Sequence, residues 1–225
     1  MSEPDVTLTD YGLALECAIL AIWLGIAPAS RKVWQFAGIG FFAFLGLSAA
    51  TGGTVHGFFP DRQVPECRLL WQATLQLIGL AAFSTWILGA GILADGRAGR
   101  WLALAAVPQI AIYSPIALLV TQEFWIALTI YVPAALLLLA GFGTVFRRDG
   151  DRYGLIGASG SVLSLVSSLI QFLRIGIDPV YFNHNALAHV VQGVALVLIF
   201  LAIRYLIGPD FSGMRVARET EMSPP

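Results

Sequence analysis

The sequence predicts an all-α, polytopic membrane protein built as a bundle of seven transmembrane helices, and three observations predict it. Of 225 residues, 57% are hydrophobic and only 12% are charged, with a mean hydropathy of +0.77. About 25% of the residues in an average soluble domain are charged. Seven apolar stretches approach the roughly 20 residues that a helix needs to cross a bilayer. The basic residues also collect in alternate loops, as in multi-pass proteins.

The predicted spans follow one another through short polar loops. Arg31 and Lys32 separate the first span from the second, Arg62 and Arg68 separate the second from the third, and Asp178-Pro179 precedes the last. Residues 1–207 form one helical domain without an internal repeat, and residues 208–225 form a polar tail that we expect in the cytoplasm. The expected spans are 8–27, 33–58, 69–94, 101–120, 124–146, 153–173 and 183–207.

The charge of the loops predicts the orientation. Ten basic residues fall in one set of loops or in the tail and three in the other set. Positive charge favours the cytoplasmic side, so the N-terminus is predicted outside and the C-terminus inside, which agrees with an odd number of spans. The acidic start at Glu3 and Asp5 is unlike a secretory signal. We expect a multi-pass protein of the cell membrane, of bacterial inner-membrane type.

Three histidines provide the main functional signal. His56, His184 and His189 are the only histidines, and the topology places all three at the outer end of two spans. Imidazole is a common zinc ligand, and three protein ligands with an open position allow zinc to activate water. The sequence therefore predicts a zinc site in the extracytoplasmic half of the membrane.

The spacing of two of these histidines leaves the ligand set open. Five helical residues separate His184 and His189 by about 7.5 Å and turn them about 140° apart. If His184 lies on an irregular first turn, both can bind the metal. If His184 only caps the helix, the ligands reduce to His56, His189 and a carboxylate.

Two acidic residues in the first span are candidate catalytic groups. Glu16 lies within an apolar helix, where a carboxylate is costly, and Asp10 lies six residues earlier, about 9 Å nearer the outer surface. Glu16 can be a general base or an orienting partner, or a protonated acid that forms a hydrogen bond between helices. Asp10 can approach the metal, or serve as an ordinary helix N-terminal acid.

With these residues in place, the chain resembles the CREST superfamily, seven-helix membrane proteins that include alkaline ceramidases and the progestin and adipoQ receptors. The resemblance implies zinc held by His56, His184 and His189. Gly52 replaces the family's serine, with Ser48 one turn away, and Asn185 replaces one of the two expected histidines. The family's aspartate near the third helix is missing, so that Glu16 or Asp10 would have to substitute.

Three functions are consistent with these residues. The first is an intramembrane zinc-dependent hydrolase that cleaves an amide or ester of a lipid-like substrate and uses Glu16 or Asp10 for proton transfer. The second is an electron-transfer protein in which His56 and His189 are axial haem ligands. The third is a receptor or transporter that uses a polar cluster of Glu16, His56, Asn185, His189 and Gln192. The sequence shows no nucleic-acid patch, and its only lysine, Lys32, lies in a loop, which argues against retinal.

Overall fold

The computed structural model describes residues 2–59, 61, 63–94, 96–179, 181–209 and 211. Arg62 and most of the predicted tail, including Arg215 and Arg218, lie outside these residues. The described chain forms eight helices: α1 (Pro4–Ile26), α2 (Lys32–Phe58), α3 (Pro65–Leu93), α4 (Gly96–Leu104), α5 (Ala106–Leu119), α6 (Trp125–Asp149), α7 (Arg152–Leu173) and α8 (His184–Ile207).

The predicted fold class is confirmed. The described part of the chain is all-α, with one isolated bridge between Asp178 and Phe182, and it contains seven segments long and apolar enough to cross a membrane. The protein is therefore a multi-pass membrane protein. Helices α1 and α3 begin four residues earlier than predicted, at Pro4 and Pro65. Proline is well suited to the first helical turn, where its missing N–H has no intrahelical partner to lose.

The fourth predicted span consists of two helices rather than one. Helices α4 and α5 meet at Ala105, which belongs to neither of them. Pro108 lacks the N–H that would bond to the carbonyl of Leu104 four residues earlier, which accounts for a break at this point. A second proline, Pro115, lies within α5. Hydrophobicity alone could predict the length of this span but not its interruption.

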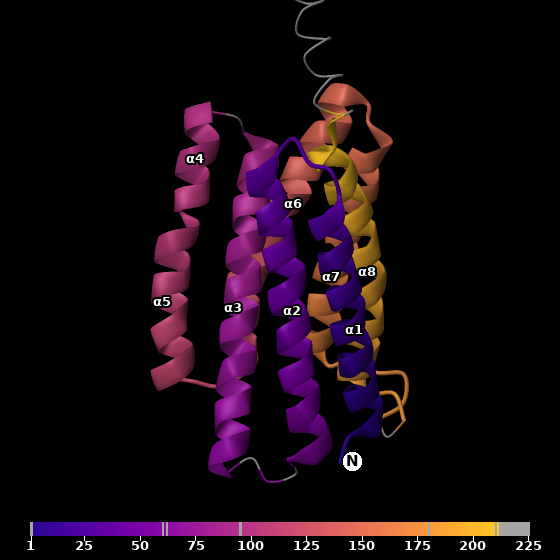
Figure 1. Ribbon diagram of the computed structural model, residues 1–225. Helices are drawn as coiled ribbons and strands as arrows, with labels where there is room; N and C mark the ends of the chain where they lie inside the picture. Colours follow the sequence, from indigo (N-terminus) through magenta and orange to yellow (C-terminus); the bar gives the residue numbers. More distant parts are fainter. Residues whose placement is uncertain are drawn as a thin grey trace, which may run out of the picture.

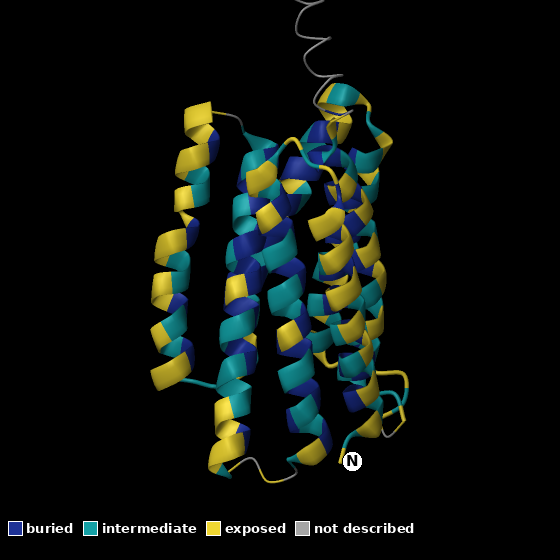
Figure 2. Ribbon diagram, in the orientation of Figure 1, coloured by how far each residue is buried: buried dark blue, intermediate teal, exposed yellow. Residues whose placement is uncertain are grey.

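Six helices form a closed ring. Helices α1, α2, α3, α6, α7 and α8 each pack against the next, and α8 packs back against α1. The fourth span lies outside this ring, where α4 and α5 pack on α3 (Figure 1). The outward faces of α4 and α5 are largely exposed, whereas buried residues concentrate on α3 and on the helix faces inside the ring (Figure 2). The interior of the ring is therefore the place where a site can form.

Glycines allow α1 and α2 to approach each other closely. A methyl group added at Gly46, Gly53 or Gly57 would come within 2.7 to 2.8 Å of a side-chain atom of α1. The α1 residues contacted run in the opposite order along the chain, as antiparallel neighbours require. Small residues are the usual means of close packing between membrane helices. The contacts pair Gly46 with Cys17, Gly53 with Asp10 and Gly57 with Thr7.

The charged ends of the bundle differ. Most of the described basic residues lie at the end where α1 terminates and α2 begins, which is the upper end in Figure 1. The opposite end carries Arg68 and Arg174, together with the N-terminus. The basic residues at the upper end are Arg31, Lys32, Arg97, Arg100, Arg147, Arg148, Arg152 and Arg204.

The packing of α3 on α6 provides a stability test. Replacing Gly89 with alanine would place a methyl group 2.9 Å from the backbone nitrogen of Leu138, which cannot rotate away. We expect Gly89→Ala to lower the free energy of unfolding by about 1–3 kcal/mol. Gly143→Ala is the matched control because a methyl group there meets nothing within 4 Å. Thermal unfolding in detergent measures both variants, and equal midpoints would contradict the packing argument.

Candidate functional site

A cavity of about 520 Å³ lies within the six-helix ring, near the end where α1 begins. All three histidines and Asp10 line it, as the sequence led us to expect for His56, His184 and His189. The remaining lining combines hydroxyl and amide groups with aromatic and aliphatic side chains and with two charged residues, Glu123 and Arg174. Its volume falls within the range of about 300–1,000 Å³ that is typical of small-molecule sites.

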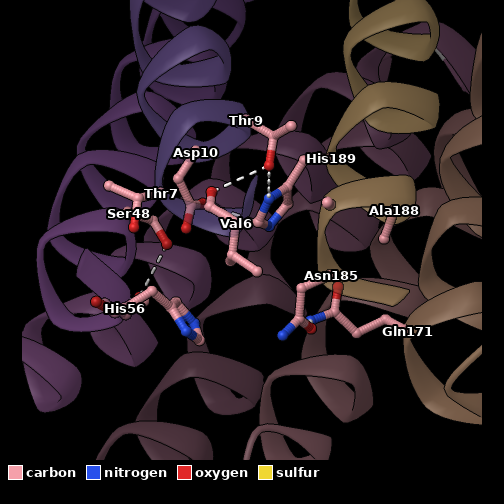
Figure 3. A network of polar contacts seen from close by, with 12 residues as sticks. Val6, Thr7, Thr9, Asp10, Ser48, His56, Gln171, Asn185, Ala188 and His189 are labelled. Atoms are coloured by element: carbon pink, nitrogen blue, oxygen red, sulfur yellow. Dashed lines mark hydrogen bonds and ion pairs between the residues drawn. The ribbon is translucent and has the colours of Figure 1, made fainter. Parts of the chain in front are cut away.

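His189 makes the central contacts of the cavity. Its Nε2 lies 3.3 Å from Oδ1 of Asp10, and its Nδ1 lies 3.2 Å from the hydroxyl oxygen of Thr9 (Figure 3). Both partners come from α1, so this imidazole joins α8 to α1. Thr9 is a partner that the sequence did not reveal, because its hydroxyl can equally bond to the carbonyls of Asp5 or Val6 in its own helix.

Asp10 is buried, and only one of its two carboxyl oxygens has a polar partner among the described residues. Its side chain is 6% exposed, and its Oδ2 has no hydrogen-bond partner among the described residues. Gly53 allows this side chain to fit between α1 and α2, because a methyl group at Gly53 would lie 2.7 Å from the Asp10 Cβ. A buried acceptor without a partner is costly and uncommon in native structures. Asp10 is the seventh residue of α1 and lies beyond its first turn, so the alternative role of a helix N-terminal acid does not apply.

His56 belongs to a different set of contacts. Its Nδ1 lies 2.9 Å from Oε2 of Glu3, and its ring meets the Trp71 indole edge-on at 6.2 Å between centroids. The hydroxyl of Ser2 donates to the His56 carbonyl. Figure 3 shows His56 and His189 approaching the cavity from different helices without a direct contact drawn between them. Ser2 and Glu3 therefore contact the C-terminal end of α2 through His56.

His184 is the first residue of α8, as the loop before it predicted. Asn183 caps the helix by accepting hydrogen bonds from the backbone N–H groups of Asn185 and Ala186, at 2.8 and 3.2 Å. The N–H of Asn183 in turn donates to Oδ2 of Asp5 on α1, at 3.1 Å. His184 and His189 line the same cavity at different depths despite their difference in helical phase.

Amides and hydroxyls complete the wall. Gln192 accepts a hydrogen bond from Ser164 at 3.0 Å and donates to the Tyr131 hydroxyl at 3.2 Å, while Tyr131 and Ser164 are 2.7 Å apart. Gln171 donates to Asn185 at 2.7 Å across α7 and α8. Gln192 and Asn185 belong to the polar cluster predicted from the sequence, whereas Tyr131 was not among the predicted residues. Its role depends on contacts between distant helices.

Glu16 does not line this cavity. It lies in a separate groove between α1 and α8, whose lining also includes Thr9 and His189. Six residues along a helix correspond to about 600°, which directs Glu16 about 120° away from Asp10. The two carboxylates therefore do not face one common site.

The described residues do not form a ready metal centre. Among the described residues, no three His, Cys, Asp or Glu side chains are grouped so that they could hold a metal ion. Both ring nitrogens of His189 already have protein partners, and Nδ1 of His56 faces Glu3. His56, His184 and His189 thus share a cavity without forming a zinc cluster. The predictions of zinc and of haem ligation stay predictions.

The fold and this site define a multi-pass α-helical membrane protein with a mostly apolar cavity that is lined by six helices and carries a few polar groups. The chain belongs to the family of unknown function DUF6962, whose sequence profile matches residues 6–207. No curated protein and no solved structure matches it. The comparisons thus provide no link to the CREST superfamily, and that resemblance stays a prediction.

The contacts of the histidines predict different effects of mutation. His189→Leu removes the partner of a buried carboxylate, and we expect it to reduce the free energy of unfolding by about 1–3 kcal/mol. His184→Leu, at the first position of α8, should change it by less than about 0.5 kcal/mol, as is usual away from buried polar contacts. Unfolding midpoints in detergent provide the comparison, and a larger loss for His184→Leu would refute it.

Proposed function

We propose that this protein binds an amphipathic small molecule in the central cavity, through a head group that donates a hydrogen bond to Asp10. The observation that carries the proposal is the unpartnered Oδ2 of Asp10, which is buried beside a cavity of about 520 Å³. A ligand donor at this oxygen would satisfy it, and leaving a buried polar atom without a partner costs about 1–3 kcal/mol.

The rest of the lining supports a ligand with both polar and apolar parts. Ser48, Thr74 and Asn185 provide neutral polar groups, while Leu13, Ile78 and Phe124 provide apolar surface. A few directed polar groups in a mostly apolar pocket are typical of small-molecule sites. This is the receptor or transporter hypothesis, with Glu16 removed from the binding cluster.

The exposed lining residues favour access from the side of the bundle. Trp125 at the start of α6 is 51% exposed and Phe172 near the end of α7 is 63% exposed, and both line the cavity. These two residues lie at the ends of α6 and α7, the level at which exposed aromatic side chains are typical of the membrane interface. We infer that a lipid-like ligand enters the cavity beside them.

The asymmetry of charge supports an orientation. The basic end of the bundle would face the cytoplasm, with the N-terminus and the cavity on the outer side of a bacterial inner membrane. In this orientation His56, His184 and His189 lie in the extracytoplasmic half.

A zinc-dependent hydrolase fits the described geometry less well. The three histidines line one cavity, but His189 is held between Asp10 and Thr9, and no triad of ligands is formed in the described chain.

Substitution of Asp10 tests the binding proposal. Asp10→Asn keeps the shape of the side chain but replaces one of its two acceptor oxygens with an NH2 group, which cannot accept a hydrogen bond. We therefore expect a ligand to bind about tenfold more weakly, the equivalent of about 1.4 kcal/mol. The measurement is the rise in unfolding midpoint with increasing concentrations of long-chain amines, amides and alcohols. At least one of these head groups should stabilise the wild-type protein.

Asp61→Asn is the matched control, because Asp61 is an exposed loop residue that accepts a hydrogen bond from the N–H of Gln63. It should bind as the wild type does. Equal affinity in Asp10→Asn and wild type would refute the proposed contact. Stoichiometric zinc in the purified protein, lost in His189→Leu, would instead favour the zinc-dependent hydrolase.

The orientation has its own test. Green fluorescent protein fused to the C-terminus should be fluorescent in a bacterial host, because it folds in the cytoplasm, and alkaline phosphatase at the same position should be inactive. Fusion of either reporter after Gly176, in the loop between α7 and α8, should reverse both results. An active phosphatase at the C-terminus would overturn the orientation.

A further inference from the structure

The groove between α1 and α8 contains a second carboxyl group that is not satisfied. Oε1 of Glu16 is buried and has no hydrogen-bond partner among the described residues. Asp10 and Glu16 carry the two such oxygens found in this part of the chain, and they face different spaces. An unsatisfied carboxyl group within a membrane span is costly, so a partner for Glu16 is expected from outside the described residues.

The groove has the size and lining of a binding site. Its volume is about 480 Å³, and Thr9, Glu16 and His189 are its polar lining residues. Val190, Val194 and Val197 form an apolar side and are 41 to 55% exposed. The polar groups therefore lie beside a surface that faces the membrane interior.

Two glycines keep this groove open. A methyl group at Gly193 would lie 2.8 Å from Oε2 of Glu16, so glycine leaves room for the carboxyl group. Gly12 lines the groove, and a methyl group there would meet nothing within 4 Å. A larger side chain at residue 12 can therefore occupy the groove without displacing a neighbouring helix.

The depth of Glu16 restricts the occupant. Glu16 lies twelve residues after the start of α1 at Pro4, or about 18 Å along the helix, which is near the middle of a bilayer with a core of about 30 Å. Phospholipid head groups are charged and remain at the surface. A hydroxyl group both donates and accepts, so it can satisfy a carboxyl group in either protonation state without bringing charge into the membrane.

We propose that the α1–α8 groove is a second binding site, for a neutral single-chain amphiphile whose hydroxyl group bonds to Glu16 and whose chain lies along the valines of α8. The site is distinct from the central cavity, although His189 and Leu13 contribute to both linings. It does not depend on whether the central cavity binds a ligand.

Photolabelling in vesicles tests this site. The protein is reconstituted in phosphatidylcholine with a diazirine derivative of hexadecanol, irradiated, digested and mapped by mass spectrometry. Label should concentrate on the groove segments of α1 and α8 and fall at least fivefold with excess unlabelled hexadecanol. Label spread evenly over the lipid-facing helices, without competition, would overturn the proposal.

Two glycine variants show whether the groove itself is required. Gly12→Leu should fill the groove. It should reduce at least fivefold the label that excess unlabelled hexadecanol competes away. Gly143→Leu makes the same change at another span glycine with open space around it and should leave the label unchanged. Equal labelling of the two variants contradicts a site in the groove.

Glu16 variants test the head group independently. A diazirine derivative of hexadecane, which lacks the hydroxyl group, should label the wild-type groove at least fivefold less than the alcohol. Glu16→Gln should keep this preference because its amide still donates and accepts, whereas Glu16→Leu should lose it. A preference that survives in Glu16→Leu would exclude Glu16 as the partner of the hydroxyl group.

Discussion

The close approach of α1 to α2 is the constraint on which the site depends. Gly53 lies so near the Asp10 side chain that any larger residue would push α1 outward. This contact holds Asp10 at the inner surface of the ring. Because α1 also packs against α8, the same helix brings Asp10 and Thr9 to the two nitrogens of His189. A displacement of α1 would therefore alter the cavity, the groove and the imidazole between them.

Helical phase divides the polar groups of α1 between two environments. Asp10 faces the enclosed cavity, and Glu16, about 120° around the helix, faces the groove. His189 borders both spaces. Carboxylates that look like alternatives for one role in the sequence therefore have separate partners. The polar residues of α1 therefore line two spaces, and His189 and Leu13 contribute to the walls of both.

Much of the fold could be predicted because a bilayer imposes a simple rule. A span must be long, apolar and helical, so all seven segments were found, and the loop before His184 was placed correctly. The break near Ala105 was missed because overall hydrophobicity is insensitive to one absent backbone hydrogen bond. Topology predicted that the three histidines lie at one end of the bundle, and the structure places them in one cavity there. Topology gives depth in the membrane, however, and not the direction of each side chain.

The sequence by itself determined the class of protein, the number of spans and the level at which the histidines lie, because length and hydrophobicity set these properties locally. Only the tertiary structure decided which groups touch. The partners Thr9 and Asp10 of His189 lie about 180 residues away, and Glu3 reaches His56 across the N-terminal end of the bundle. These contacts depend on how neighbouring helices rotate and how closely they pack, which in turn depends on both surfaces at once.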